Sequence, residues 1–314
     1  MKEIVKKFND IAFVWTYECN TDCEYCFSTR YIEPYKNISL SFDTYKEILN
    51  KIVENWVNSV SFIWWEPALW PEINNAIRYA KEKWIKTTVF SNAMIKLKEK
   101  PGVFFIHLNV LFLTKNKTIL ENLYEYSKDS KIVFIYNVYK PNKYSLKLLL
   151  KILESFRFDF AISFNIVFDD KIDKTYWDFI YNAYNYITSK MNKDVMSSWP
   201  LPHCIFKDEL INFLKDKKVL EDSYWAASFA NTDVFFTVVN PDGKSSLSCA
   251  PINIKMDISY LLKGDYSGYV EKYSEIFWPI LKQENSFCSW CKKFNKECQY
   301  GWVVNLYNSP EIKI

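Results

Sequence analysis

Two hydrophobic periods alternate along the first two thirds of the chain. Short apolar, β-branched runs predict strands, and the segments between them carry apolar residues at helical spacing. We expect strands at residues 11–17, 59–64, 86–91, 103–111, 131–138 and 159–167. We expect helices at residues 42–55, 71–83, 117–127, 144–155 and 175–190, the first of them capped by Ser41.

This strand–helix alternation predicts an α/β fold with a parallel sheet covered by helices, either closed toward a barrel or open. The strand–helix alternation stops after residue 191, and Pro200 and Pro202 indicate a domain boundary. We therefore expect one domain over residues 1–195 and a smaller one over residues 196–314. In the second, the turn signal at residues 240–243 separates strand-like residues 234–239 and 245–249, which predicts a β-hairpin.

Composition and charge exclude some classes of function. The net charge is +3 and the pI is about 8.2, with scattered lysines, so a nucleic-acid partner is not expected. We find no apolar run long enough to span a bilayer and no secretory signal, so we expect a cytoplasmic protein with no membrane partner. In that compartment the eight cysteines indicate metal or redox chemistry rather than disulfides.

Three cysteines, Cys19, Cys23 and Cys26, follow the first predicted strand within eight residues. Three thiolates on one loop can bind a [4Fe–4S] cluster and leave its fourth iron open for chemistry. Structural zinc is the competing metal, although it normally takes four protein ligands. Buried structural cysteines are the other alternative, but they do not predict this spacing where a parallel strand ends.

With Tyr25 before the last cysteine, this C-x3-C-x2-C motif resembles that of the radical SAM superfamily over about the first 190 residues. The resemblance implies a partial (β/α)6 barrel. It also implies that the three cysteines hold a [4Fe–4S] cluster whose open iron binds S-adenosylmethionine (SAM). Reductive cleavage of SAM would give a 5′-deoxyadenosyl radical that abstracts a substrate hydrogen.

In that family the second strand ends in Gly-Gly-Glu-Pro, whereas this chain reads Trp64-Trp65-Glu66-Pro67. The resemblance implies that this segment binds the methionine part of SAM and that Glu66 holds its amino group. It further places Ser91 and Asn92 near the SAM ribose, in a turn that the family writes Thr/Ser-Asn-Gly. Ala93 departs from that pattern.

Tryptophan and glycine occur in an inverted ratio, with 12 Trp and 5 Gly, where average usage gives roughly 22 Gly. Trp56 and Trp84 directly follow predicted helices, at positions where a left-handed glycine is usual. We hypothesise that several tryptophans, Trp56, Trp64, Trp65 and Trp84 among them, are glycines encoded by a recoded stop codon. The alternative is true divergence to a protein that has lost SAM binding.

The C-terminal third carries a second set of cysteines: Cys249, Cys288, Cys291 and Cys298. Their spacing resembles the SPASM or twitch extension of radical SAM enzymes, in a small domain built on the β-hairpin. The four match the twitch count and suffice for one auxiliary [4Fe–4S] cluster, with structural zinc as the alternative. Cys204 has no assigned role.

The resemblance implies a radical SAM enzyme, either an oxidoreductase or a peptide-modifying enzyme, that works anaerobically with a flavodoxin- or ferredoxin-type electron donor. A peptide or protein substrate is favoured over a small molecule, although no separate leader-peptide-binding domain is recognisable. If Trp64 and Trp65 are genuine, the alternative is a non-catalytic Fe–S or zinc protein.

Overall fold

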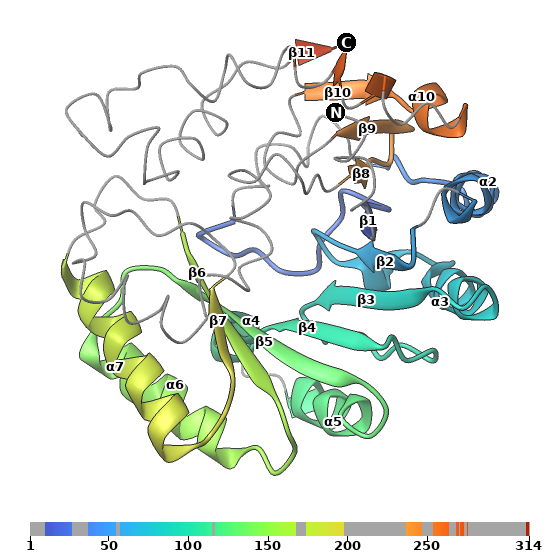
Figure 1. The fold of residues 1–314 in the computed structure, drawn as a ribbon. Helices are drawn as coiled ribbons and strands as arrows, with labels where there is room; N and C mark the ends of the chain where they lie inside the picture. The colour runs from blue at the N-terminus through green and yellow to red at the C-terminus, as the bar shows by residue number, and fades with distance from the viewer. Residues whose placement is uncertain are drawn as a thin grey trace.

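The computed structural model describes residues 10–26, 37–54, 57–114, 117–167, 174–197, 237–246, 254–263, 268–269, 271–272, 275 and 312–313 (Figure 1). The predicted auxiliary cysteines, Cys249, Cys288, Cys291 and Cys298, lie outside the described residues, as do Cys204 and Trp56. The predicted auxiliary site therefore stays a prediction.

A parallel sheet forms the centre of the molecule and confirms the predicted α/β class. Its first six strands are hydrogen-bonded in chain order, as successive strand–helix units produce. They are β1 (Asp10–Phe13), β2 (Ser59–Phe62), β3 (Lys86–Ser91), β4 (Val103–His107), β5 (Lys131–Val138) and β6 (Ala161–Ile166), and β7 (Val195–Ser197) follows β6.

Strands from the C-terminal third continue the sheet beyond β1. Strand β8 (Thr237–Val239) pairs parallel to β1, and β9 (Lys244–Ser246) returns antiparallel to β8. The turn between them contains Gly243 at φ +71°, so the predicted hairpin is confirmed. The sheet ends with β10 (Ile254–Asp257) and β11 (Ile312–Lys313). A domain division at residue 195 stays a prediction.

In the described part of the chain, five helices lie close to their predicted bounds, and three shorter ones, at residues 67–69, 108–114 and 259–262, were not predicted. They are α2 (Phe42–Val53), η2 (Pro67–Leu69), α3 (Ile73–Glu82), α4 (Leu108–Thr114), α5 (Lys117–Tyr126), α6 (Lys143–Ser155), α7 (Lys174–Lys190) and α10 (Ser259–Leu262). The Ser41 side chain accepts a hydrogen bond from the Thr44 backbone N–H at 3.0 Å, which confirms the predicted cap of α2. None of the described helices is both long and apolar enough to cross a membrane.

The prediction of a strand over residues 103–111 is wrong in its second half. Strand β4 ends at His107 and the chain continues directly as helix α4. A short apolar run has the same appearance in a buried strand and in a buried helix, so the pattern alone does not locate this change.

The two faces of the sheet have different partners. Helices cover the convex outer face (Figure 1), and the main core lies between them and side chains such as Phe13, Phe62, Phe104 and Phe134. Because side chains alternate along a strand, their neighbours face the concave side. A second apolar cluster on that side contains Ala12, Val14, Tyr17, Ile63, Trp65 and Val238.

His107 ends β4 on the side opposite Phe104 and Ile106. Its neighbour Phe105, two residues earlier, stacks on Phe90 with ring centroids 4.3 Å apart. Burial lowers the pKa of His107 to about 4 because the imidazolium loses hydration there.

We expect His107 to titrate well below the ordinary range of histidine. An NMR titration should show one imidazole with a pKa near 4, and this signal should remain in a His203→Gln variant. Between pH 6.5 and 4 the unfolded chain binds this proton first, so His107 lowers the stability as the pH falls. Two imidazoles that both titrate near pH 6.5 would contradict the prediction.

Candidate functional site

The segment after β1 carries the three cysteines across the carboxyl ends of the strands. Two hydrogen bonds hold its beginning. The Glu66 backbone N–H donates to the Glu18 carbonyl at 3.1 Å, and the Asn92 side-chain amide donates to the Asn20 side-chain oxygen at 2.6 Å. The ends of β2 and β3 therefore fix the backbone on either side of Cys19.

The other end of this cysteine loop is attached to the segment that follows β5. The Glu24 carboxylate accepts hydrogen bonds from the Tyr139 hydroxyl at 2.8 Å and from the Lys140 ammonium at 2.6 Å. Tyr25 lies against Tyr139, with ring centroids 5.8 Å apart. This attachment is not predictable from local sequence pattern, because residues more than one hundred positions apart form it.

The three thiols are half-buried on the same loop. The Thr21 hydroxyl lies 3.1 Å from the Cys19 sulfur and 3.8 Å from the Cys23 sulfur. The Cys26 backbone N–H donates to the Cys23 carbonyl at 2.8 Å, which closes a turn that contains Tyr25. Burial raises the pKa of the Cys19 thiol, and the hydrogen bonds to Thr21 partly oppose this effect. Within the described part of the chain these cysteines form no disulfide.

Three thiols on one loop are ligands of the kind that an iron–sulfur cluster takes. Among the described residues, no three Cys, His, Asp or Glu side chains converge on one point as ligands of one metal ion. A [4Fe–4S] cubane is much larger than one ion, and its cysteine ligands stand further apart. Three cysteines on one loop, none bonded to another, fit such a cluster.

Glu66 is the most heavily bonded side chain of the site and is fully buried. Its carboxylate accepts hydrogen bonds from the Ala68 backbone N–H at 3.0 Å, the Ser91 hydroxyl at 2.8 Å and the Asn92 backbone N–H at 2.8 Å. Burial raises the pKa of Glu66 to about 7, although the three donors favour the ionised form. Pro67 follows as the first residue of the short helix η2.

The indoles of Trp64 and Trp65 occupy the concave side beside the cysteine loop. Trp65 is 8% exposed and contacts Tyr17 edge to face, with ring centroids 4.5 Å apart. Trp64 packs against the same apolar cluster, to which Cys19 also belongs. The sequence as printed therefore places two large side chains in or against the apolar cluster that Cys19 also contacts.

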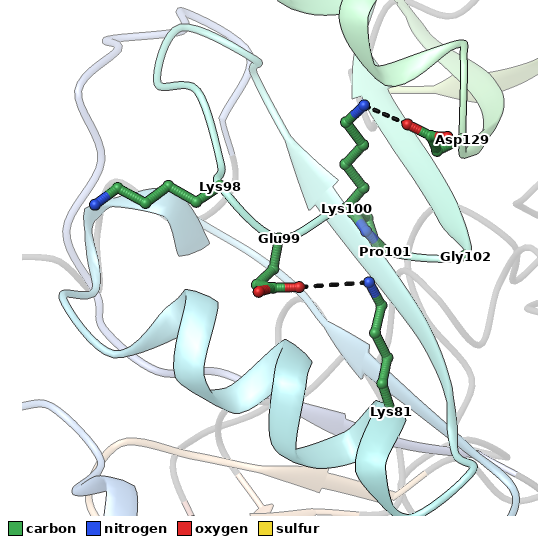
Figure 2. Close-up of a pocket in the computed structure, with 7 residues that line it drawn as sticks. All are labelled: Lys81, Lys98, Glu99, Lys100, Pro101, Gly102 and Asp129. Carbon is green, nitrogen blue, oxygen red and sulfur yellow. Dashed lines mark hydrogen bonds and ion pairs between the residues drawn. The ribbon is translucent and has the colours of Figure 1, made fainter.

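A hollow of about 390 Å³ lies at the opposite ends of the strands (Figure 2). Glu99 is paired there with Lys81 at 3.6 Å, and Lys100 is paired with Asp129, while Lys98 points away. The hollow lies before the start of β4, whereas the active sites of parallel α/β barrels lie where the strands end. We therefore do not assign the site to this hollow.

Residues 13–126 match the family model described as the Radical SAM superfamily. The matched segment is similar to a radical SAM domain, and it contains the cysteine loop, Glu66, Ser91 and Asn92. Members of that family use a [4Fe–4S] cluster and SAM as cofactors. A comparison with curated protein sequences finds no match.

Solved structures with the same fold include three of SuiB from Streptococcus suis. The structure bound to S-adenosylmethionine is 17% identical at a TM-score of 0.64, over 94% of this chain and 72% of SuiB. The structure bound to precursor peptide SuiA is 16% identical at a TM-score of 0.63, over 96% of this chain and 72% of SuiB. A third is 16% identical at a TM-score of 0.58, over 79% of this chain and 62% of SuiB. The likeness shows that the fold is shared.

The structure brings the residues that the sequence singled out in the first domain to one end of the sheet. They are Cys19, Cys23, Tyr25, Cys26, Trp64, Trp65, Glu66, Pro67, Ser91 and Asn92. Their roles with cluster and SAM stay predictions. In the structure the Glu66 carboxylate accepts hydrogen bonds from Ser91 and Asn92 of the same chain, which the sequence motif did not predict.

Replacing Glu66 by glutamine is expected to lower the free energy of unfolding by about 1–3 kcal/mol at pH 5, because an amide nitrogen would then face a backbone N–H. Glu99→Gln is the matched control. It breaks only partly exposed surface pairs and should cost at most about 1 kcal/mol. Urea unfolding measures both. Equal costs for the two variants would contradict the prediction.

The cost of Glu66→Gln should also depend on pH. Because the pKa of Glu66 is raised from 4.5 to about 7, the folded protein keeps this proton through a range in which the unfolded chain has lost it. Wild-type stability therefore falls as the pH rises from about 4.5 to 7, by about 1–3 kcal/mol from this group, whereas glutamine does not titrate. The stability gap between wild type and variant should narrow from pH 5 to pH 8. A stability difference that grows from pH 5 to pH 8 would show that folding lowers the pKa of Glu66, and would contradict the prediction.

Proposed function

We propose that the protein is a radical SAM enzyme. The observation that carries the proposal is the attachment of a three-cysteine loop to the buried Glu66 network at the carboxyl ends of β1, β2 and β3, within the segment that matches the radical SAM family. When bound, the [4Fe–4S] cluster and SAM would supply a 5′-deoxyadenosyl radical by reductive cleavage of SAM, and the radical would abstract a hydrogen from the substrate.

The residues of the chain hold and orient these groups. Cys19, Cys23 and Cys26 would supply three thiolates to the cluster, and their half-buried position would restrict water. Glu66, fixed by Ser91 and Asn92, would present negative charge to the amino group of SAM. The attachment of Glu24 to Tyr139 and Lys140 would keep the end of the loop in place when the thiolates bind.

A peptide or protein is the substrate class that we propose. Support comes from SuiB with precursor peptide SuiA, a structure that shares the fold over 96% of this chain. We further propose that Cys249, Cys288, Cys291 and Cys298 form a twitch-like site for a second [4Fe–4S] cluster, and that a flavodoxin- or ferredoxin-type protein supplies the electron.

A non-catalytic Fe–S or zinc protein is the second candidate. One observation favours it: the Trp65 indole is buried against Tyr17, in the space beside the cysteine loop where SAM would have to lie. This candidate applies only if the indoles are present in the protein that cells make.

Cleavage of SAM tests the enzyme proposal. Anaerobically reconstituted protein with glycine at positions 64 and 65, reduced with dithionite, should release 5′-deoxyadenosine from SAM, as measured by chromatography. Replacing Cys19, Cys23 and Cys26 together by serine should abolish release, because serine does not replace the cluster thiolates. Glu99→Gln, far from the site, should leave release unchanged. No release from a protein that holds its cluster would favour the non-catalytic candidate.

Metal content tests the auxiliary site separately. Two clusters require about eight irons per chain, whereas one cluster and a structural zinc require about four irons and one zinc. We expect about eight irons in the reconstituted protein, and about four after Cys288 and Cys291 are replaced by serine. Four irons in both proteins would contradict the proposed second cluster.

A further inference from the structure

The backbone at three tryptophans adopts a conformation that tryptophan avoids. The φ angles are +61° at Trp64, +46° at Trp65 and +61° at Trp84. In this left-handed region the Cβ atom of an L-residue lies too close to the following carbonyl oxygen, at a cost that glycine does not have. A bulky residue there is a clear outlier.

Tryptophan is over-represented at such positions in this chain. Among the described residues, seven non-glycine residues have positive φ: Asn37, Trp64, Trp65, Trp84, Ala93, Lys140 and Asn192. Asparagine tolerates this region, so its presence is ordinary. Tryptophan does not tolerate it, yet three of the six described tryptophans have a positive φ.

The other described tryptophans, Trp15, Trp70 and Trp177, behave as tryptophan should. None of them has a positive φ. Trp15 and Trp70 are buried and stack with ring centroids 3.7 Å apart, and Trp177 stacks on Tyr181 at 4.9 Å. The described tryptophans therefore fall into two groups, one with packed indoles and ordinary φ angles and one whose backbone conformation favours glycine.

At Trp84 the left-handed backbone conformation conflicts with the tryptophan side chain at a position away from the candidate site. It directly follows helix α3 and its C-cap Lys83. The Trp84 N–H donates to the Lys81 carbonyl at 2.9 Å, and the Ile85 N–H donates to the Ala80 carbonyl at 3.0 Å. This pair of bonds is the Schellman motif, whose left-handed residue is usually glycine. The indole is 93% exposed, so burial does not compensate for the backbone.

We infer that residues 64, 65 and 84 are glycine in the protein that its own cells make, encoded by a reassigned stop codon that the printed sequence renders as tryptophan. Residues 15, 70 and 177 are tryptophan. At residues 64 and 65 the change removes both indoles from the apolar cluster that contains Tyr17 and that Cys19 contacts. It therefore opens a ligand site against a bare backbone. The inference concerns residue identity and stands independently of the proposed function.

The gene and the native protein test the inference directly. We expect one codon at residues 64, 65 and 84 and a different codon at residues 15, 70 and 177. Peptide mass spectrometry of protein isolated from its own cells should read glycine at the first three positions. One shared codon at all six positions, or indole mass at residues 64 and 65 in the native peptide, would overturn it.

Melting temperatures provide a test that involves neither cofactor nor activity. In the tryptophan-containing recombinant protein, Trp84→Gly should raise the melting temperature by about 2–4 °C, because it removes a left-handed tryptophan. Trp177→Gly is the matched control and should lower the melting temperature, because it removes a stacked indole and places glycine within helix α7. A fall for Trp84→Gly as large as that for Trp177→Gly would contradict the inference. If the codons divide as expected but no SAM is cleaved, the proposed function fails and this inference stands.

Discussion

The buried Glu66 carboxylate is the interaction on which the rest of the site depends. It joins the end of β2 to the end of β3 through the Ser91 hydroxyl and the Asn92 N–H, and it also caps the short helix η2 through the Ala68 N–H. A buried carboxylate is costly unless such donors surround it. Its position is therefore determined by two strand ends together, which gives the site a fixed centre.

The cysteine loop takes its position from that centre. The backbone N–H of Glu66 bonds to Glu18, and Asn92, which bonds to Glu66, also bonds to Asn20. The same few residues thus place the thiols and the carboxylate relative to each other. If the thiols hold a cluster as proposed, an amino acid bound to it would have the Glu66 carboxylate available as a hydrogen-bond acceptor for its amino group.

Much of this architecture is predictable from local pattern. The strands and helices of the first two thirds of the chain follow from apolar spacing, and the Ser41 cap follows from residue type, because both are local properties. The change from β4 to α4 at residues 107–108 is not predictable from local pattern, since one apolar run forms both elements. The attachment of Glu24 to Tyr139 and Lys140 is not predictable either, because these segments are far apart in the sequence and come together only in the folded sheet. Left-handed backbone at Trp84 was predictable from its place after a helix, and the structure confirms it.

We propose that residues 64–66 and the cysteine loop form one site for SAM and a cluster. The most direct test is the electron paramagnetic resonance spectrum of the reduced cluster in protein with glycine at positions 64 and 65, recorded with and without SAM. We expect SAM to change the spectrum, and to do so only at higher concentration in the same protein carrying Glu66→Gln. A spectrum that SAM leaves unchanged, in protein with a full complement of iron, would contradict it.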